Sequence, residues 1–353
     1  MPDVLMQQTS PYGTRRASVL QGDGDLYLYL EDLVGPQPHT VSAVWIANHA
    51  EVPIDVLTPS PPGTPARMAA SGTAHPDGCP PLAADAALVW FEEGDGVALV
   101  DGDGLIAAVP GWAGRDGFYG YSRYAVGRSS LAWEAGGEAR RALERKITES
   151  QDFWAWRLGR VWPEIRASGL AHLGERIGPQ EAVWPVGEGL FPEIIATRHH
   201  LSEQGVWVTA TTGLSAQRMA GMEEYLEDAD AAAHIELVIA RASPDQAGPE
   251  VLAALATVPF GRCTWLGEGH TVGGTAGTYP AFGNDKAAIL LTEHPPVGDG
   301  PAPPDLSGLA RRSAPVHYLW VLLIDEKTFE LARGRDARAA LDHLAETGHT
   351  WIQ

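Results

Sequence analysis

The sequence predicts an α+β protein, in which strands and helices both occur but do not follow the regular βαβ rhythm of a doubly wound fold. The first observation is a series of short apolar runs, bounded by Gly, Asp or Pro, in the first half of the chain. The second is a change near residue 136 to apolar residues that recur at helical spacing. Strand-like and helix-like segments then intermingle after residue 179. We therefore expect a β-rich N-terminal domain, a helical connector, and a C-terminal mixed sheet flanked by helices.

Strands are predicted in the first half wherever an apolar run has the length of a strand. These runs cover residues 25–33, 40–49, 86–91, 96–100 and 105–110. Residues 57–81 lie between them as a long loop, because its prolines prevent ladder pairing and its polar residues suit the surface.

Helices are predicted in the middle of the chain, at 136–159 and 163–178. Leu143, Ile147 and Trp154 recur at helical spacing between charged residues in the first of them. The second half adds predicted strands at 193–200, 205–213, 234–240, 287–293 and 317–324, of which the first two form a hairpin. Its predicted helices are 248–258 and 326–346, the latter broken near Gly334.

The length of 353 residues favours two domains, because one hydrophobic core seldom grows to that size. We expect an N-terminal tail at 1–17, a β-rich domain at 18–135, the helical connector at 136–178 and the C-terminal domain at 179–353.

Composition narrows the possible partners. Acidic residues outnumber basic ones by 45 to 25, and a formal charge of -20 argues against nucleic-acid binding, because such a surface repels phosphate. Cys79 and Cys263 are too few for a disulfide framework or a thiolate metal site. No signal peptide and no apolar run of membrane-spanning length is evident, so a cytoplasmic protein without membrane contact is expected.

Asp-Gly pairs at 22–25, 92–96 and 101–104 raise the question of calcium binding. An EF-hand loop needs ligands at alternating positions and a Glu at its twelfth position, whereas residues 101–104 lead directly into an apolar strand. Because Asp-Gly supplies the positive backbone angles of hairpin turns, we interpret these pairs as turns.

The glycine-rich segment 264–274 contains Glu268 and His270. A dinucleotide site needs a helix that starts at the third glycine, but Gly and Pro residues follow Gly273. A metal site needs further ligands, and no His-Glu-x-x-His or paired-Cys motif occurs. No cofactor or metal is therefore expected.

Histidine and serine residues elsewhere give no clear catalytic motif. His199 and His200 are adjacent on a predicted strand, so they should point to opposite faces and not share an ion. Ser215 and Ser122 lack the Gly-x-Ser-x-Gly elbow of exposed serine nucleophiles. The enzymatic alternative is a hydrolase with a site between the domains, where Glu268 and His270 would be the general acid/base pair.

An acidic run near the middle of the second half is the candidate partner-binding segment. Its acidic residues create a field that attracts a basic partner, and its tyrosine is the kind of amphipathic anchor that interfaces favour. The alternative is a solvated face or the start of a helix. The candidate residues are Glu223, Glu224, Tyr225, Glu227, Asp228 and Asp230.

Four separated stretches of the second half together resemble segments of a known protein family, at 208–219, 234–240, 263–274 and 314–344. The residues that matter most are Thr212, Gly213, Leu214, Ser215 and Met219 in the first, Glu236 in the second, and Trp265, Leu266, Gly267, Gly269, His270 and Thr271 in the third. In this order they resemble the suppressor of fused domain of bacterial type, over about residues 183–346. The resemblance implies that the glycines and His270 form a shared structural loop.

The resemblance also implies protein binding without enzymatic activity. Animal members sequester a transcription factor, and bacterial members include proposed immunity proteins that neutralise toxins. The expected partner is therefore another protein, with a basic toxin as one candidate. Animal partner-binding residues lie in a second domain that this sequence does not match, so none is assigned here.

Overall fold

A computed structural model of the chain describes residues 2–49, 51, 66–187, 189, 191–334 and 337–353. The chain divides into two compact units. The first comprises Met1–Gly159 and Gly261–Cys263, and the second comprises Arg160–Phe260 and Thr264–Gln353. The first part of the predicted loop at 57–81 lies outside the described residues, which resume at residue 66.

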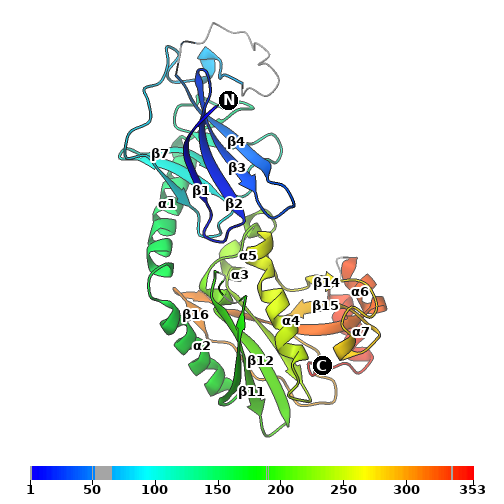
Figure 1. Cartoon of the computed structure of the whole chain (residues 1–353). Coiled ribbons are helices and arrows are strands. Elements are labelled where there is room, and N and C mark those ends of the chain that lie inside the picture. The colour runs from blue at the N-terminus through cyan, green and yellow to red at the C-terminus, as the bar shows by residue number, and fades with distance from the viewer. Residues whose placement is uncertain (1, 50, 52–65, 188, 190, 335–336) are drawn as a thin grey trace. The chain divides into compact units, whose positions relative to one another are not determined.

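The first unit contains a four-stranded antiparallel sheet in the order β1-β2-β3-β4, drawn in blue in Figure 1. Its strands are β1 (Asp3–Thr9), β2 (Arg15–Gln21), β3 (Asp25–Asp32) and β4 (His39–Asn48). The apolar side chains of β3 and β4 are buried, among them Leu28 and Trp45 at 0% exposure. The two strands predicted in this region are confirmed.

A second sheet of the first unit has the order β5-β6-β7-β8-β9. Its strands are β5 (Ala87–Trp90), β6 (Val97–Asp101), β7 (Gly104–Val109), β8 (Tyr121–Ser122) and β9 (Trp133–Glu134), after the 3-10 helix η1 (Ala70–Gly72). Helix α1 (Gly137–Arg157) places Leu143 and Ile147 in one apolar cluster with Phe91 and Leu105. The helical spacing read from the sequence therefore marks the face that packs against this sheet.

Strand β1 was not predicted, because residues 1–17 were expected to form a tail. The structure pairs Asp3–Thr9 with β2. Six of its seven residues are exposed, so β1 lacks the buried apolar alternation that reveals a strand in a sequence. The expectation that residues 1–17 form a tail is therefore wrong for Asp3–Thr9, because these residues pair with β2 at the edge of the sheet.

The Asp-Gly pairs form turns, as predicted. Between β6 and β7 the Asp101 carboxylate accepts a hydrogen bond from the Asp103 N–H at 2.9 Å, and Gly104 has a φ of +96°. Between β2 and β3 the Gly22 N–H donates to the Asp25 carbonyl at 2.9 Å. These positions therefore close hairpins.

The second unit is built on a seven-stranded sheet in the order β10-β11-β12-β13-β18-β15-β14. The neighbours are antiparallel except for β13 and β18, which are parallel. The strands are β10 (Gln180–Val186), β11 (Ile194–Leu201), β12 (Val206–Thr212), β13 (Ile235–Arg241), β14 (Thr271–Gly273), β15 (Lys286–Thr292) and β18 (His317–Asp325). Strands β16 (Ala310–Arg311) and β17 (Ala314–Pro315) form a separate pair. This mixed sheet confirms the α+β class and the predicted hairpin of β11 and β12.

The described residues also form the helices α2 (Trp162–Arg176), α3 (Ala229–Ala232), α4 (Ala247–Ala256), α5 (Val258–Arg262), α6 (Glu326–Arg333) and α7 (Ala337–Glu346), with the 3-10 helices η2 (Leu214–Ala216), η3 (Met222–Glu224) and η4 (Pro280–Phe282). Of these, α2, α4 and α6 contact strands of the large sheet. The end of α6 at Arg333 confirms the predicted break near Gly334.

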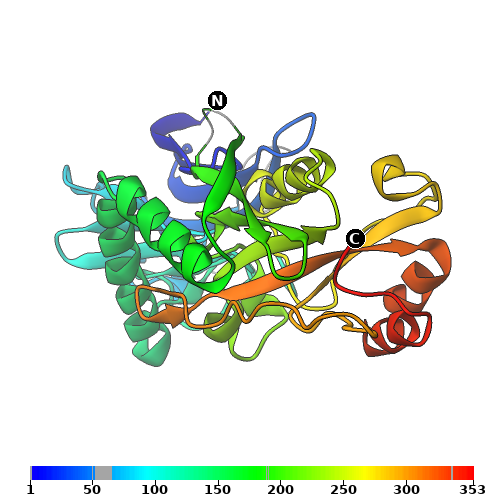
Figure 2. The same ribbon diagram turned by 90° about the horizontal axis from the view of Figure 1, so that it is seen from below.

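Two apolar clusters fix the helices of the second unit. Leu173 of α2 lies in one cluster with Val208, Val238 and Trp351. The side chains of α6 and α7 pack with β15 and β18 in the other. Figure 2 shows the red helices beside the end of the orange strand β18. The two helices that the sequence grouped as a connector therefore pack on different sheets, α1 in the first unit and α2 in the second.

Candidate functional site

The turn after β12 is held by a buried carboxylate. Glu236 on β13 accepts hydrogen bonds from the Thr211 hydroxyl at 2.6 Å and from the Gly213 N–H at 2.9 Å. The Ser215 N–H donates to it at 3.1 Å and the Ser215 hydroxyl at 2.6 Å. Glu236 and Ser215 are both fully buried at 0% exposure. Two of the stretches that suggested the family thus meet in one polar cluster.

Glycine is required at the first position of this turn. Gly213 has a φ of +109°, and a Cβ atom there would lie 2.5 Å from the Glu193 carbonyl oxygen and 2.7 Å from the Trp162 ring. Only a residue without a side chain fits both the left-handed backbone and the close approach of these neighbours.

Arg311 and His234 complete the cluster around Ser215. Arg311 lies 3.3 Å from the Ser215 hydroxyl and donates to the Ser168 hydroxyl at 2.7 Å. The His234 Nδ1 lies 2.8 Å from the Ser215 carbonyl. Burial lowers the pKa of His234 to about 4, so its ring is neutral at pH 7. The Ser215 hydroxyl is therefore buried and donates to the Glu236 carboxylate, and the His234 ring contacts the Ser215 carbonyl and not the hydroxyl.

The glycine-rich segment 264–274 forms a bend that leads into β14. The Gly269 N–H donates to the Leu291 carbonyl at 2.8 Å, and the Leu291 N–H donates to the His270 carbonyl at 2.9 Å. A Cβ atom at Gly267 would lie 2.5 Å from the Trp265 ring. These glycines permit close packing and backbone pairing, as expected for a structural loop.

Glu268 and His270 have different partners. The Glu268 carboxylate accepts from the Thr292 hydroxyl at 2.8 Å and from the Glu293 N–H. The His270 ring lies 4.1 Å from the Trp265 ring, centroid to centroid. Burial lowers the pKa of His270, while a hydrogen bond to the Trp265 backbone raises it. Glu268 and His270, which the sequence suggested as a general acid/base pair, therefore contact different structural partners.

His199 and His200 point to opposite faces of β11, as predicted. His199 is fully buried, with its Nδ1 2.7 Å from the Gly178 carbonyl. His200 stacks on Trp207 at 4.5 Å between ring centroids. Within the described part of the chain, no three His, Cys, Asp or Glu side chains are grouped so that they could hold a metal ion.

The acidic segment and the glycine-rich bend meet at the surface of the second unit. The Tyr225 side chain is 62% exposed, and its ring lies 6.1 Å from the Trp265 ring. Trp265 in turn contacts His270. We call Glu223, Glu224, Tyr225, Glu227, Asp228, Asp230 and Trp265 the acidic–aromatic surface. The sequence identified its acidic part but not the contribution of Trp265, because no spacing pattern links residues forty positions apart.

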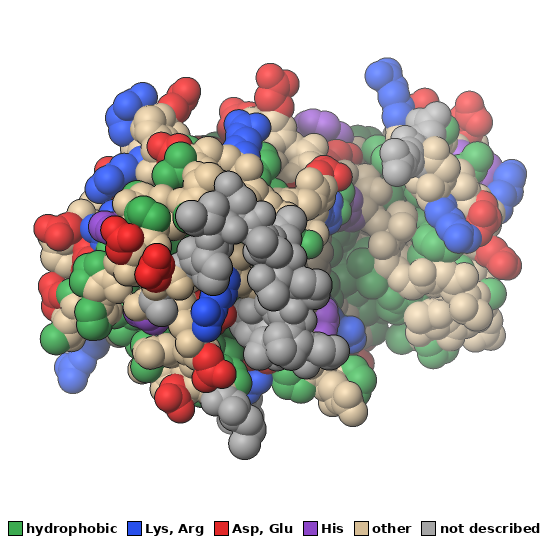
Figure 3. Space-filling view, turned by 90° about the horizontal axis from the view of Figure 1, so that it is seen from above, with side chains coloured by type: hydrophobic (Ala, Val, Ile, Leu, Met, Phe, Trp, Pro, Cys, Tyr) green, Lys and Arg blue, Asp and Glu red, His purple; other side chains and the backbone are tan. Residues whose placement is uncertain are grey.

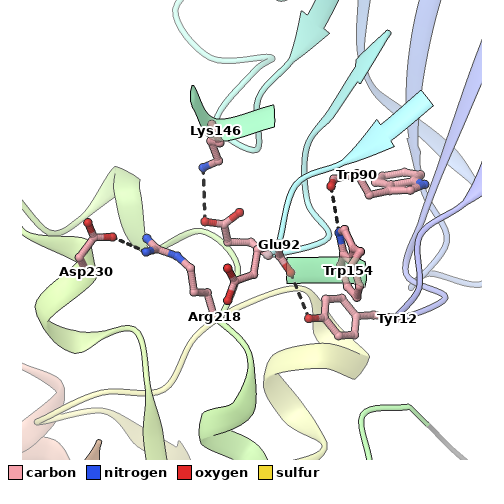
Figure 4. A network of polar contacts seen from close by, with 8 residues as sticks. Tyr12, Trp90, Glu92, Lys146, Trp154, Arg218 and Asp230 are labelled. Atoms are coloured by element: carbon pink, nitrogen blue, oxygen red, sulfur yellow. Dashed lines mark hydrogen bonds and ion pairs between the residues drawn. The ribbon is translucent and has the colours of Figure 1, made fainter. Parts of the chain in front are cut away.

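Two of the acidic residues also have structural roles. Asp228 caps helix α3 by accepting a hydrogen bond from the Ala231 N–H at 3.1 Å. Asp230 forms an ion pair with Arg218, which Figure 4 shows directed at its carboxylate. The alternative interpretation of the acidic segment, as the start of a helix, is therefore correct for Asp228. Glu223, Tyr225 and Glu227 remain exposed to solvent.

The first unit contains a polar cluster of a structural kind. The Tyr12 hydroxyl donates to the Glu92 carbonyl at 3.0 Å, and the Trp154 indole N–H donates to the Trp90 carbonyl at 2.9 Å (Figure 4). Lys146 lies 3.3 Å from Glu93. The contacts of Trp154 and Lys146 join α1 to the end of β5 and the residues after it, and the Tyr12 contact joins the β1–β2 turn to the same segment.

Comparison with known proteins identifies the domain. Residues 193–353 match the family model described as Suppressor of fused protein (SUFU). The C-terminal part of this chain therefore contains a suppressor of fused domain, which confirms the resemblance found in the sequence. A comparison with curated proteins gave no match.

Two solved structures are similar to part of the chain. One is a putative suppressor of fused homolog from Neisseria gonorrhoeae FA 1090, at 14% identity and a TM-score of 0.37, covering 54% of this chain and 94% of that one. The other is the Sufu-Fu complex, at 14% identity and a TM-score of 0.38, covering 51% of this chain and 83% of that one.

Two further observations concern the described residues. No helix among the described residues combines the length and the apolar character needed to cross a membrane. On the face in Figure 3, acidic and basic side chains of the described residues are interspersed.

Proposed function

We propose that this protein binds another protein through the acidic–aromatic surface of its suppressor of fused domain. The observation that carries the proposal is the exposed Tyr225 ring beside Trp265, within a segment of five acidic residues. Tyrosine and tryptophan supply large contact area at binding hot spots.

Charge indicates the kind of partner. The chain has a formal charge of -20, and Glu223, Glu224 and Glu227 add local negative charge around Tyr225. Such a field speeds the capture of a basic protein and makes the association rate fall with salt. We propose a basic partner, and the toxin of a toxin–immunity pair fits this requirement. In that role the protein would neutralise the toxin by covering a basic surface.

Co-expression with toxin genes that neighbour the gene for this protein tests the immunity role. The expected result is a complex that co-purifies and a host cell that survives the toxin. A set of candidates of which none binds or is neutralised would contradict the immunity role.

A pair of triple variants tests the surface itself. Glu223, Glu224 and Glu227 are changed to Gln in one variant, and the exposed Glu175, Glu203 and Glu346 in a control with the same change of charge. Only the first should lower the association rate, by about tenfold at low salt. Equal rates for the two variants would show that the acidic–aromatic surface does not guide binding.

A further inference from the structure

A pocket of about 310 Å³ lies in the second unit at the ends of β15 and β18. Its apolar wall includes Phe282, Leu323 and Ile352, and its polar wall includes Lys286 and His349. All of these residues belong to the suppressor of fused domain, but the acidic–aromatic surface contributes none of them.

The wall formed by residues 347–353 is fixed in place. Trp351 is fully buried and donates its indole N–H to the Pro301 carbonyl at 2.7 Å. The Gln353 N–H donates to the Ala240 carbonyl at 2.9 Å, and its side chain accepts from the Leu323 N–H at 2.9 Å. A ligand would therefore enter a pocket that already has its shape, which reduces the entropy cost of binding.

Lys286 gives the pocket a cationic group. Its side chain is 14% exposed, and its Nζ lies 3.5 Å from the carboxylate of Asp285, which is 68% exposed. Asp325 lies opposite Lys286 on β18, but its carboxylate accepts the Thr328 N–H at 2.8 Å and caps α6. Asp285, an ion-pair partner of Lys286 among the described residues, is thus solvent-exposed and distant enough for the ammonium to bind a better-placed anion.

His349 adds a group that can become cationic. The Thr347 hydroxyl lies 2.7 Å from the His343 carbonyl and 3.0 Å from the His349 Nδ1. Because a carbonyl only accepts, the hydroxyl proton goes to His343 and Nδ1–H donates to the hydroxyl oxygen. The neutral ring therefore takes up its second proton at Nε2. Burial and Lys286 lower its pKa, His343 lowers it further, and Asp325 and Asp285 raise it.

We propose that this pocket binds a small organic anion, with its carboxylate against the Lys286 ammonium and its apolar body against Phe282, Leu323 and Ile352. An inorganic anion would leave the apolar wall uncovered, and a neutral molecule would leave Lys286 without a matched partner. Protonated His349 provides a second positive charge for the carboxylate. Binding should therefore strengthen as pH falls.

Titration of the full-length protein with benzoate, followed by ligand-detected NMR, tests the proposal. A dissociation constant of about 1 mM or lower is expected for a ligand of this size. Benzamide, which has nearly the same shape and no charge, should bind at least tenfold more weakly. Affinity for benzoate should rise as the pH falls below about 6.5, because the pKa of His349 is lowered and its ring becomes protonated only there.

Two lysine variants distinguish benzoate binding in the pocket from a general effect of the protein's net charge. Lys286→Met keeps the aliphatic stem and should weaken benzoate binding about tenfold or more. Lys327→Met changes an exposed residue of α6 by the same charge and should leave binding unchanged. Absence of saturable benzoate binding, equal binding of benzamide, or equal loss in the two variants would each overturn the proposal. None of these results depends on whether the protein binds another protein.

Discussion

Glu236 and Ser215 are joined by two hydrogen bonds to one carboxylate oxygen, from the Ser215 N–H at 3.1 Å and from its hydroxyl at 2.6 Å. The two residues lie twenty-one positions apart, on β13 and in the turn after β12. This contact explains why an acidic residue occurs inside an apolar strand of the second unit. The buried Glu236 carboxylate accepts the hydrogen bonds that the donors of the turn would otherwise give to water.

The first prediction concerns this carboxylate. Glu236→Gln places an amide NH₂ against hydrogen-bond donors and should lower the free energy of unfolding by about 2–4 kcal/mol, because buried groups lose their partners. Urea unfolding followed by fluorescence measures the change. Glu203→Gln, at an exposed turn position, is the control and should change the stability by less than about 0.5 kcal/mol. Equal midpoints for the two variants would exclude a supporting role for Glu236.

The second prediction concerns the turn backbone. Gly213→Ala should cost about 2–4 kcal/mol, because the new Cβ meets both a strained φ and atoms at 2.5 Å and 2.7 Å. Gly205 also has a positive φ, +66°, but a Cβ there meets nothing within 4 Å. Gly205→Ala should therefore cost only about 1–2 kcal/mol, the strain alone. If the two variants lost the same stability, close packing at Gly213 would play no part.

The third prediction concerns pH. Burial lowers the pKa of His234 from 6.5 to about 4 in the folded protein, so the unfolded chain binds the proton more strongly. Stability from this residue is complete above about pH 6.5 and declines as pH falls toward about 4, by an amount of the order of 2–3 kcal/mol.

Unfolding measured in urea across this range should show a flatter pH dependence for His234→Gln than for the natural protein. The glutamine side chain keeps a hydrogen-bond donor but does not titrate. An unchanged slope would mean that His234 does not contribute to acid destabilisation.

Regular elements were largely predictable because their patterns are local. The hairpin of β11 and β12 and the helix α1 have clear periodicity, and their core residues follow from it. β1 and β14 were not predictable, since one is exposed over most of its length and the other has only three residues. Pro185 likewise obscured β10, and it is tolerated because β10 is an edge strand.

The candidate site was predictable only in part. Acidic residues and an aromatic residue close together in the chain identified the segment around Tyr225. Its contact with Trp265, and the separate partners of Glu268 and His270, depend on how distant strands pair. The sequence alone cannot supply that information.

The most direct test of the proposed function is the dissociation constant of Tyr225→Ala for the protein partner recovered by co-expression. We predict a loss of at least about thirtyfold, as for a binding hot spot, with little change in stability because the side chain is 62% exposed. Tyr119→Ala, at another exposed tyrosine, should bind like the natural protein. A Tyr225→Ala variant that binds as tightly as the control would contradict the account.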